Sequence, residues 1–202
     1  AALEGTGKLV AFYSPKGGVG CTTLAVNAAT AISQLDSSLR VAIVDGRFQF
    51  GAVKIMLDMR ANRSIVDLVN NIDELEVDLI ESAMVRDDRS GLRALLAPPK
   101  PEQADLVEAG HVQAILERLK DMFDFVIVDM GSTLRELELA VFDQADRILL
   151  VATPDLPAIT NVRNFFELMQ GLCYTRALIL LVLNKSLENS GLYTRIIEES
   201  LK

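Results

Sequence analysis

The stretch Pro15-Lys16-Gly17-Gly18-Val19-Gly20-Cys21-Thr22-Thr23 decides how the rest of the chain is interpreted. An apolar run at residues 9–13 precedes it, and a helix-forming run at residues 24–29 follows it. This order predicts a strand, a glycine-rich loop and a helix. Glycines let the backbone turn its N–H groups inward, and the start of a helix adds partial positive charge there. The loop is therefore predicted to bind phosphate.

Charged and hydroxyl side chains around the loop support the same prediction. Lys16 brings a positive charge to the start of the loop, and Thr22 and Thr23 can reach a Mg²⁺ ion and an inner phosphate oxygen. The usual P-loop pattern ends in Gly-Lys-Ser/Thr. Here Cys21 stands in the lysine position, and Pro15 stands in the position of the first glycine.

Two other interpretations of the loop remain open. A Rossmann dinucleotide loop requires G-x-G-x-x-G, but residues 18–23 end in threonine. Asp45, after the next apolar run, would suit the ribose-binding acid of that fold, whereas Lys16 and the threonine pair favour a P-loop. The other alternative is a plain structural turn.

Composition limits the class of protein. A chain of 202 residues with 50% hydrophobic content can form one hydrophobic core without disulfides or structural metal ions. A net charge of -8 argues against a broad nucleic-acid or acidic-lipid surface, although a local basic patch is compatible with it. Cys21 and Cys173 lie far apart, which favours a reducing cytosol over a disulfide framework.

Apolar runs alternating with helical patterns predict an α/β fold: a P-loop NTPase-like three-layer sandwich with a mostly parallel central sheet. Residues 1–7 resemble a linker or the cut edge of a longer chain, and residues 8–202 form the predicted domain. The predicted strands are residues 9–13, 40–45, 92–97, 125–129, 147–152 and 177–183, and the helices are 24–29, 65–69, 78–84, 109–122, 158–170 and 191–202. His111 is the only histidine and has no obvious nucleophile partner, which argues against a histidine-based triad, and it is expected on a solvated helix face.

Two acids end predicted strands. Asp129 closes residues 125–129, which resemble a Walker B strand, and it is expected to hold a Mg²⁺-bound water. Asp45 is expected to act on a metal or water at the same edge, because ligands of open α/β sheets bind at the carboxyl ends of strands. A solvated loop acid is the alternative for Asp45.

A polar residue also ends the last predicted strand. The Asn184 carboxamide can pair with the edge of a purine base, and Leu187 cannot replace the aspartate with which GTPases bind guanine, so adenine is favoured. A simple turn residue is the alternative. The full set of predicted cofactor-binding residues is Gly17, Gly18, Val19, Gly20, Cys21, Thr22, Thr23 and Asn184.

These motifs together resemble the deviant Walker A ATPases of the ParA and MinD superfamily. Residues 14–20, 49–51, 92–101 and 153–157 are similar to the CpaE and TadZ branch, whose members help to position and assemble Flp/Tad-type pili. The resemblance implies ATP and Mg²⁺ as cofactors, an N-terminal receiver-like domain in a longer chain, and a homodimer in which Lys16 reaches across to the partner's nucleotide.

Two departures from that family bear on the chemistry. Relatives carry a second lysine at Cys21 and a second acid at Arg47. Loss of the lysine is expected to weaken nucleotide affinity by about one to two orders of magnitude. Loss of the acid is expected to slow hydrolysis further, leaving at most a slow Mg²⁺-dependent ATPase with Lys16 and Asp45 as catalytic residues. A helix start can also lower the pKa of Cys21, and its thiolate would repel phosphate.

Three functions follow as hypotheses. The first is an ATP-binding, dimerising localisation factor for pilus assembly, cytoplasmic and recruited to a cell pole. Its partners are pilus or polar proteins, with no direct nucleic acid and with membrane contact only through partners. The second is an active ParA-type ATPase that moves DNA or another cargo. The third is an interaction domain whose loop holds no nucleotide.

Overall fold

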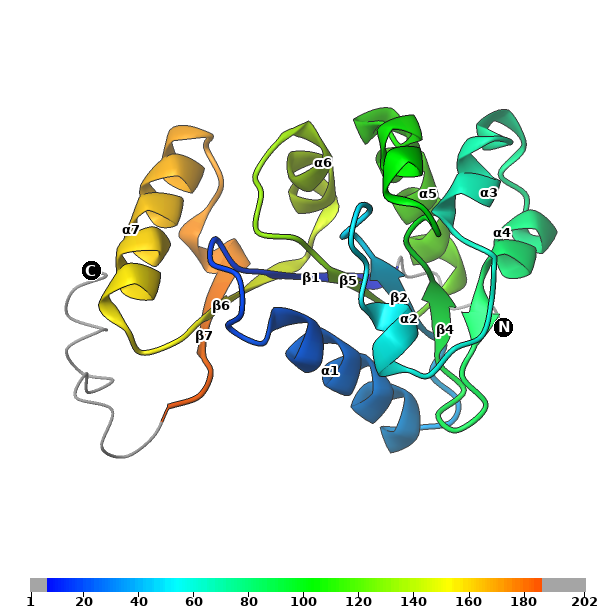
Figure 1. Cartoon of the computed structure of the whole chain (residues 1–202), viewed down its shortest axis with the longest axis horizontal. Helices are drawn as coiled ribbons and strands as arrows, with labels where there is room; N and C mark the ends of the chain where they lie inside the picture. The colour runs from blue at the N-terminus through cyan, green and yellow to red at the C-terminus, as the bar shows by residue number, and fades with distance from the viewer. Residues whose placement is uncertain (1–6, 187–202) are drawn as a thin grey trace.

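The computed structural model describes residues 7–186, which form a seven-stranded sheet covered by helices on both faces (Figure 1). The strand order is β3-β4-β2-β5-β1-β6-β7, and only the β3–β4 pair is antiparallel. The strands are β1 Lys8–Tyr13, β2 Val41–Asp45, β3 Val85–Arg86, β4 Arg93–Leu95, β5 Phe125–Asp129, β6 Arg147–Ala152 and β7 Ile179–Leu183. The predicted α/β sandwich with a mostly parallel sheet is thus confirmed.

The helices lie in two layers. Figure 1 shows α1 below the sheet and α3 to α7 above it, and short α2 packs into the same apolar cluster as α1. The α-helices are α1 Cys21–Leu35, α2 Val53–Met56, α3 Ile65–Val69, α4 Val77–Ala83, α5 Ala109–Met122, α6 Glu136–Gln144 and α7 Leu156–Gly171, with 3₁₀ turns at η1 Ile72–Glu74, η2 Pro101–Leu106 and η3 Arg176–Leu178. The central strands are therefore buried on both faces, which explains why β2 and β5 are nearly continuous apolar runs.

Some boundaries differ from the prediction. Strand β4 is shorter than the predicted 92–97, and residues 177–178 belong to η3 and precede β7. Helix α6 was not predicted, because its buried side chains, Ala140, Val141 and Phe142, are consecutive and lack helical spacing. Two-residue β3 is too short to give an alternating pattern.

The first described residue of the chain is part of the packed domain. Gly7, the first described residue, donates its backbone N–H to the Lys120 carbonyl at 2.7 Å. The predicted helix at 191–202 and residues 1–6 of the predicted linker at 1–7 lie outside the described residues, whereas Gly7, the last residue of that linker, is buried. Among residues 7–186, no helix has the length and apolar character needed to cross a membrane.

Candidate functional site

The predicted phosphate loop connects β1 to α1 at the carboxyl edge of the sheet. Gly18 and Gly20 have φ angles of 77° and 95°, a left-handed region that favours glycine. A Cβ atom on Gly20 would also lie 2.5 Å from Asn184 Nδ2. Helix α1 begins directly afterwards, with the Leu24 N–H donating to the Gly20 carbonyl at 3.0 Å. The loop conformation therefore depends on glycine at both positions.

A cavity of about 560 Å³ opens in front of this loop. It brings together the loop, the start of α1, the segment after β2, the segment after β5 and the end of β7. Its lining residues are Ser14, Lys16, Gly17, Gly18, Val19, Gly20, Cys21, Thr22, Thr23, Arg47, Ala52, Met130, Gly131, Ser132, Asn184 and Lys185. All the predicted cofactor-binding residues line this single cavity.

The residues after β7 brace the loop and also line the cavity. Asn184 Nδ2 donates to the Val19 carbonyl at 2.8 Å, and Lys185 Nζ donates to the Gly18 carbonyl at 2.8 Å. These two bonds occupy the carbonyls of Val19 and Gly18, whereas a loop of this kind binds phosphate through its N–H groups. Contact of Asn184 with a base remains a prediction. The bracing role of Lys185 was missed, because no motif marks it.

Asp45 is buried and engaged by the backbone. One carboxylate oxygen accepts the Val53 N–H at 3.0 Å, and the other accepts the Arg47 N–H at 3.2 Å. Burial raises the pKa of Asp45 to about 6, and these hydrogen bonds limit the rise. The side chain therefore ties β2 to the start of α2. Its predicted action on water remains a prediction.

Asp129 is the least satisfied polar group of the site. It lies beside Asp45 in the β2–β5 register and is fully buried. Burial raises its pKa to about 7; the nearby Thr22 hydroxyl opposes the rise and the charge of Asp45 adds to it. Within residues 7–186, however, neither of its oxygens has a hydrogen-bond partner within normal distance limits. A buried carboxyl without a partner is costly, and it suits a site completed by a cation.

Lys16 is held by an acid that the sequence analysis did not select. Its ammonium nitrogen lies 2.8 Å from each carboxylate oxygen of Asp155. Asp155 caps the start of α7 by accepting the Ala158 N–H at 2.9 Å, and it also accepts the Thr153 hydroxyl. The hydrogen bond from Lys16, followed by the one from Thr153, lowers the pKa of Asp155 to about 2. The sequence signal for the helix cap was Asp155, an acid that lies just before a proline, Pro157, in the first turn of α7. No local sequence pattern predicted that Asp155 also pairs with Lys16.

Cys21 corrects one hypothesis. A lowered pKa at a helix start was expected to make a thiolate, but burial raises the pKa of Cys21 to about 12, and the charge of Asp129 raises it further. The thiol is therefore neutral at physiological pH and does not repel phosphate.

His111 also differs in detail from the expected solvated residue, because its Nδ1 accepts the Glu108 N–H at 3.1 Å at the start of α5.

Arg47 points toward the first turn of α1. Its Nη1 donates to Thr22 Oγ1 at 3.3 Å, and it lines the same cavity as the loop. Thr22 and Asp129 are the predicted metal-site residues. The described residues hold no cluster of three histidine, cysteine or acidic side chains that could hold a metal by itself. A Mg²⁺ ion at Thr22 would therefore take its remaining ligands from phosphate and water.

A glycine-rich loop before a helix, an acid at the end of the neighbouring strand and a large cavity at the carboxyl edge define the P-loop NTPase class. The family model described as an AAA domain, AAA_31, matches residues 7–180, so the chain belongs to this family. Among curated proteins, it is 26% identical over 165 residues to the septum site-determining protein MinD of Synechocystis sp., covering 81% of this chain and 59% of that protein. MinD of Thermotoga maritima is 24% identical over 181 residues, covering 89% and 64%. The chain thus spans less than two thirds of the length of these relatives.

Solved structures agree with this placement. The ParA family ATPase from Chlorobium tepidum TLS superposes with a TM-score of 0.89 at 25% identity, covering 96% of this chain and 80% of that one. MinD from Pyrococcus horikoshii OT3, complexed with Mg-ADP, has the same fold with a TM-score of 0.80 at 17% identity, covering 96% and 77%. The predicted ParA/MinD superfamily is confirmed.

Proposed function

We propose that this chain is an ATP-binding, dimerising localisation factor of the CpaE/TadZ type, which acts in pilus assembly and hydrolyses ATP slowly or not at all. The observation that carries the proposal is the cavity in front of the glycine loop, together with the buried Asp129, whose carboxylate has no hydrogen-bond partner within residues 7–186. Inward amides, a helix start and a buried acid form a donor set suited to a Mg²⁺-bound triphosphate.

Each part of the cofactor has candidate residues in this chain. The backbone of Gly17, Gly18 and Gly20 would bind the phosphates, while Thr22 and Asp129 would hold Mg²⁺ directly and through water. When bound, Mg²⁺ neutralises phosphate charge and orients the terminal phosphoryl group. The orphaned oxygens of Asp129 fit this role, because a metal-bound water would donate to them.

Slow hydrolysis is supported by the surroundings of Asp45. Both of its oxygens already accept backbone N–H groups, and a basic residue, Arg47, follows two positions later. Positioning of the attacking water is a large part of phosphoryl-transfer catalysis. A carboxylate used for backbone hydrogen bonds is poorly placed to supply it.

Dimerisation through the carboxyl edge is supported by exposed apolar side chains. Phe50 is 72% exposed, Ile55 is 79% exposed and Leu156 is 70% exposed, and all three follow carboxyl ends of strands β2 and β6. Apolar surface of this kind favours association. Lys16 lies on the same edge and is only partly buried in its pair with Asp155, so a partner's nucleotide could attract it.

We place the protein in the cytoplasm, with recruitment to a cell pole by partner proteins.

Calorimetric titration of ATP and ADP with Mg²⁺, together with phosphate release and sedimentation with and without nucleotide, tests this proposal. We expect ATP binding, nucleotide-dependent dimers and slow turnover. Turnover at rates ordinary for the superfamily would reject the slow-hydrolysis part. Absence of any heat or thermal shift with Mg-ATP would reject nucleotide binding and favour a ligand-free interaction domain.

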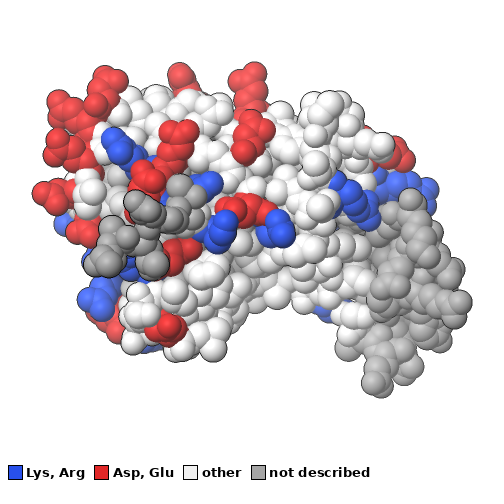
Figure 2. All heavy atoms as spheres, turned by 180° about the vertical axis from the view of Figure 1, so that it is seen from behind, with Lys and Arg blue, Asp and Glu red and all other residues white. Residues whose placement is uncertain are grey.

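A ParA-type partitioning ATPase is the second candidate, favoured by the likeness to the Chlorobium ParA family ATPase. On the face shown in Figure 2, Lys and Arg side chains of the described residues are interspersed with Asp and Glu instead of forming a stripe. The chain as a whole carries a net charge of -8. ATP-dependent DNA binding that weakens steeply with salt would support this candidate over a pilus factor.

A further inference from the structure

We infer that Arg47 supplies the phosphate-binding cation that the loop lacks at Cys21. This inference rests on the proposed nucleotide binding and names the residue that makes it possible. The P-loop pattern places a lysine at the last position before Ser/Thr, where it reaches the terminal phosphates. In this chain the position carries a neutral thiol, so another cation must meet the phosphate charge.

The other cations of the cavity are already engaged. Among its lining residues, the cationic side chains are Lys16, Arg47 and Lys185. Lys16 is bound by both oxygens of Asp155, and Lys185 donates to the Gly18 carbonyl. Using either for phosphate would break an existing contact. Arg47 makes one long hydrogen bond, from Nη1 to the neutral Thr22 hydroxyl at 3.3 Å, so it has the least to lose.

Arg47 is aimed at the phosphate side of the loop. Its guanidinium Nη1 lies 3.3 Å from Thr22 Oγ1 on the first turn of α1, and both residues line the cavity. That hydroxyl is a neutral acceptor at a long distance, and guanidinium has five N–H donors. Within the described part of the chain, the other N–H groups of the guanidinium make no hydrogen bond. They can therefore bind the oxygens of a phosphate in the bidentate manner that arginine favours.

The charge of Arg47 is felt by the groups around the phosphate position. Burial raises the pKa values of Cys21, Asp45 and Asp129, and the charge of Arg47 opposes part of that rise at each of the three. The geometry agrees, since the Arg47 guanidinium contacts Thr22, the residue next to Cys21, and lines the same cavity as Cys21. This is the place where a cation compensates best for bound phosphate.

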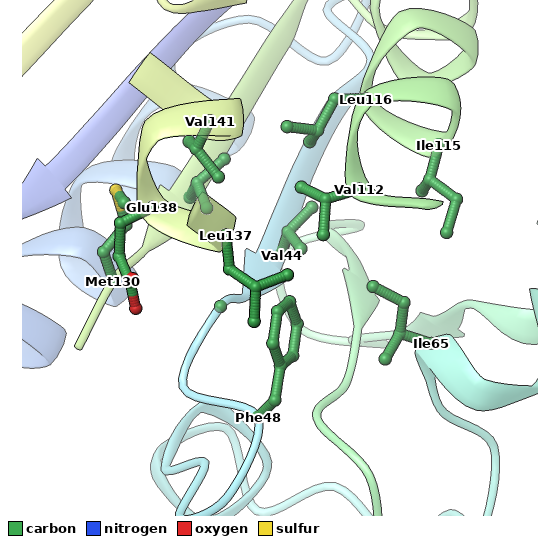
Figure 3. A pocket seen from close by; sticks show the side chains of 12 residues that line it. Val44, Phe48, Ile65, Val112, Ile115, Leu116, Met130, Leu137, Glu138 and Val141 are labelled. Carbon is green, nitrogen blue, oxygen red and sulfur yellow. The ribbon is translucent and has the colours of Figure 1, made fainter. Parts of the chain in front are cut away.

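The segment that carries Arg47 is fixed on both sides. The Arg47 N–H donates to Asp45 at 3.2 Å, and the next residue, Phe48, is only 8% exposed. Figure 3 shows the Phe48 ring beside Leu137 and pointing toward Ile65 and Val112, in an apolar pocket formed by several elements. A cation on an anchored segment loses little conformational freedom when it binds phosphate.

The decisive experiment is titration of Arg47→Ala, Arg47→Lys and the double variant Arg47→Ala with Cys21→Lys against ATP, ADP and AMP. Removing one charged contact should weaken ATP binding by about 10- to 100-fold. AMP binding should be unchanged, because AMP lacks the β- and γ-phosphates. Arg47→Lys should retain part of the affinity, and Cys21→Lys should restore ATP binding in the double variant.

Arg118→Ala is the matched control, because Arg118 is exposed on α5 near the amino end of β5, far along the chain from the loop. It removes the same charge and should leave all affinities unchanged. Circular dichroism and thermal melting check that each variant is folded. Wild-type ATP affinity in folded Arg47→Ala would overturn the inference while leaving the proposed function intact. If the wild type binds no nucleotide, the proposed function and the inference both fail.

Discussion

Replacing Asp129 with asparagine should stabilise the nucleotide-free protein at alkaline pH. Asp129 is fully buried, has no hydrogen-bond partner among the described residues, and lies beside a second acid. Its pKa is raised from 3.8 to about 7, chiefly by burial. The folded state therefore holds this proton more tightly than the unfolded state, so stability is greatest below the unfolded pKa and falls as pH rises from about 4 through about 7.

The size of the effect follows from the two pKa values. At pH 8 the shift from 3.8 to about 7 corresponds to about 4 kcal/mol of lost stability, and at pH 5 to about 2 kcal/mol. Asparagine removes this titration but brings a buried amide that needs its own partner, at a cost of about 1 to 2 kcal/mol. We therefore expect Asp129→Asn to gain about 2 kcal/mol at pH 8 and almost nothing at pH 5.

Urea unfolding of wild type and Asp129→Asn at pH 5 and pH 8, without nucleotide or Mg²⁺, measures the gain. A stability change of equal size at both pH values, or a loss at pH 8, would refute the reasoning that Asp129 is a strained, unpaired acid. With Mg-ATP the order should reverse, because only the wild type has the carboxylate for a metal-bound water. Asp45→Asn is a poorer choice, since the oxygens of Asp45 are already hydrogen-bonded.

Three further results are expected. Asp155→Ala should lower the free energy of unfolding in urea by about 1 kcal/mol, because the α7 cap is lost. Asp155→Asn keeps the cap and loses only the partly exposed ion pair with Lys16, so it should cost under about 0.5 kcal/mol. Equal costs for the two variants would contradict this division. At pH 8, mass spectrometry should find exposed Cys173 alkylated by iodoacetamide well before Cys21, whose pKa is about 12, and the opposite order would show a reactive loop thiol. Gly20→Ala should cost about 1 to 2 kcal/mol by thermal or urea unfolding because of its left-handed backbone; an unchanged stability would mean that the loop adapts.

The order of elements and the location of the site were predictable because they depend on local patterns. Buried strands of the sheet are apolar runs, and the glycine loop sits between the first run and its helix. The carboxyl ends of parallel strands then bring Asp45 and Asp129 side by side. Helix α6 could not be predicted in this way, because its buried residues are consecutive and do not recur at helical spacing.

Side-chain partnerships across the chain were not predictable. Lys16 and Asp155 are 139 residues apart, and no local pattern specifies that they pair. The direction of the Cys21 pKa shift was predicted incorrectly, because a helix start alone suggests a lower pKa, whereas tertiary burial dominates. Arg47 was identified as a departure from the superfamily, but its approach to Thr22 depends on how Phe48 is buried.

The braces on the loop tie its order to the rim of the sheet. Asn184 and Lys185 follow β7, which is the last strand in the sheet order, and they bond to carbonyls 165 and 167 residues earlier. Outer strands are where local opening of a fold usually begins. Opening of the end of β7 would remove the hydrogen-bond donors from the carbonyls of Val19 and Gly18. Local opening at the end of β7 and loss of order in the glycine loop are therefore coupled.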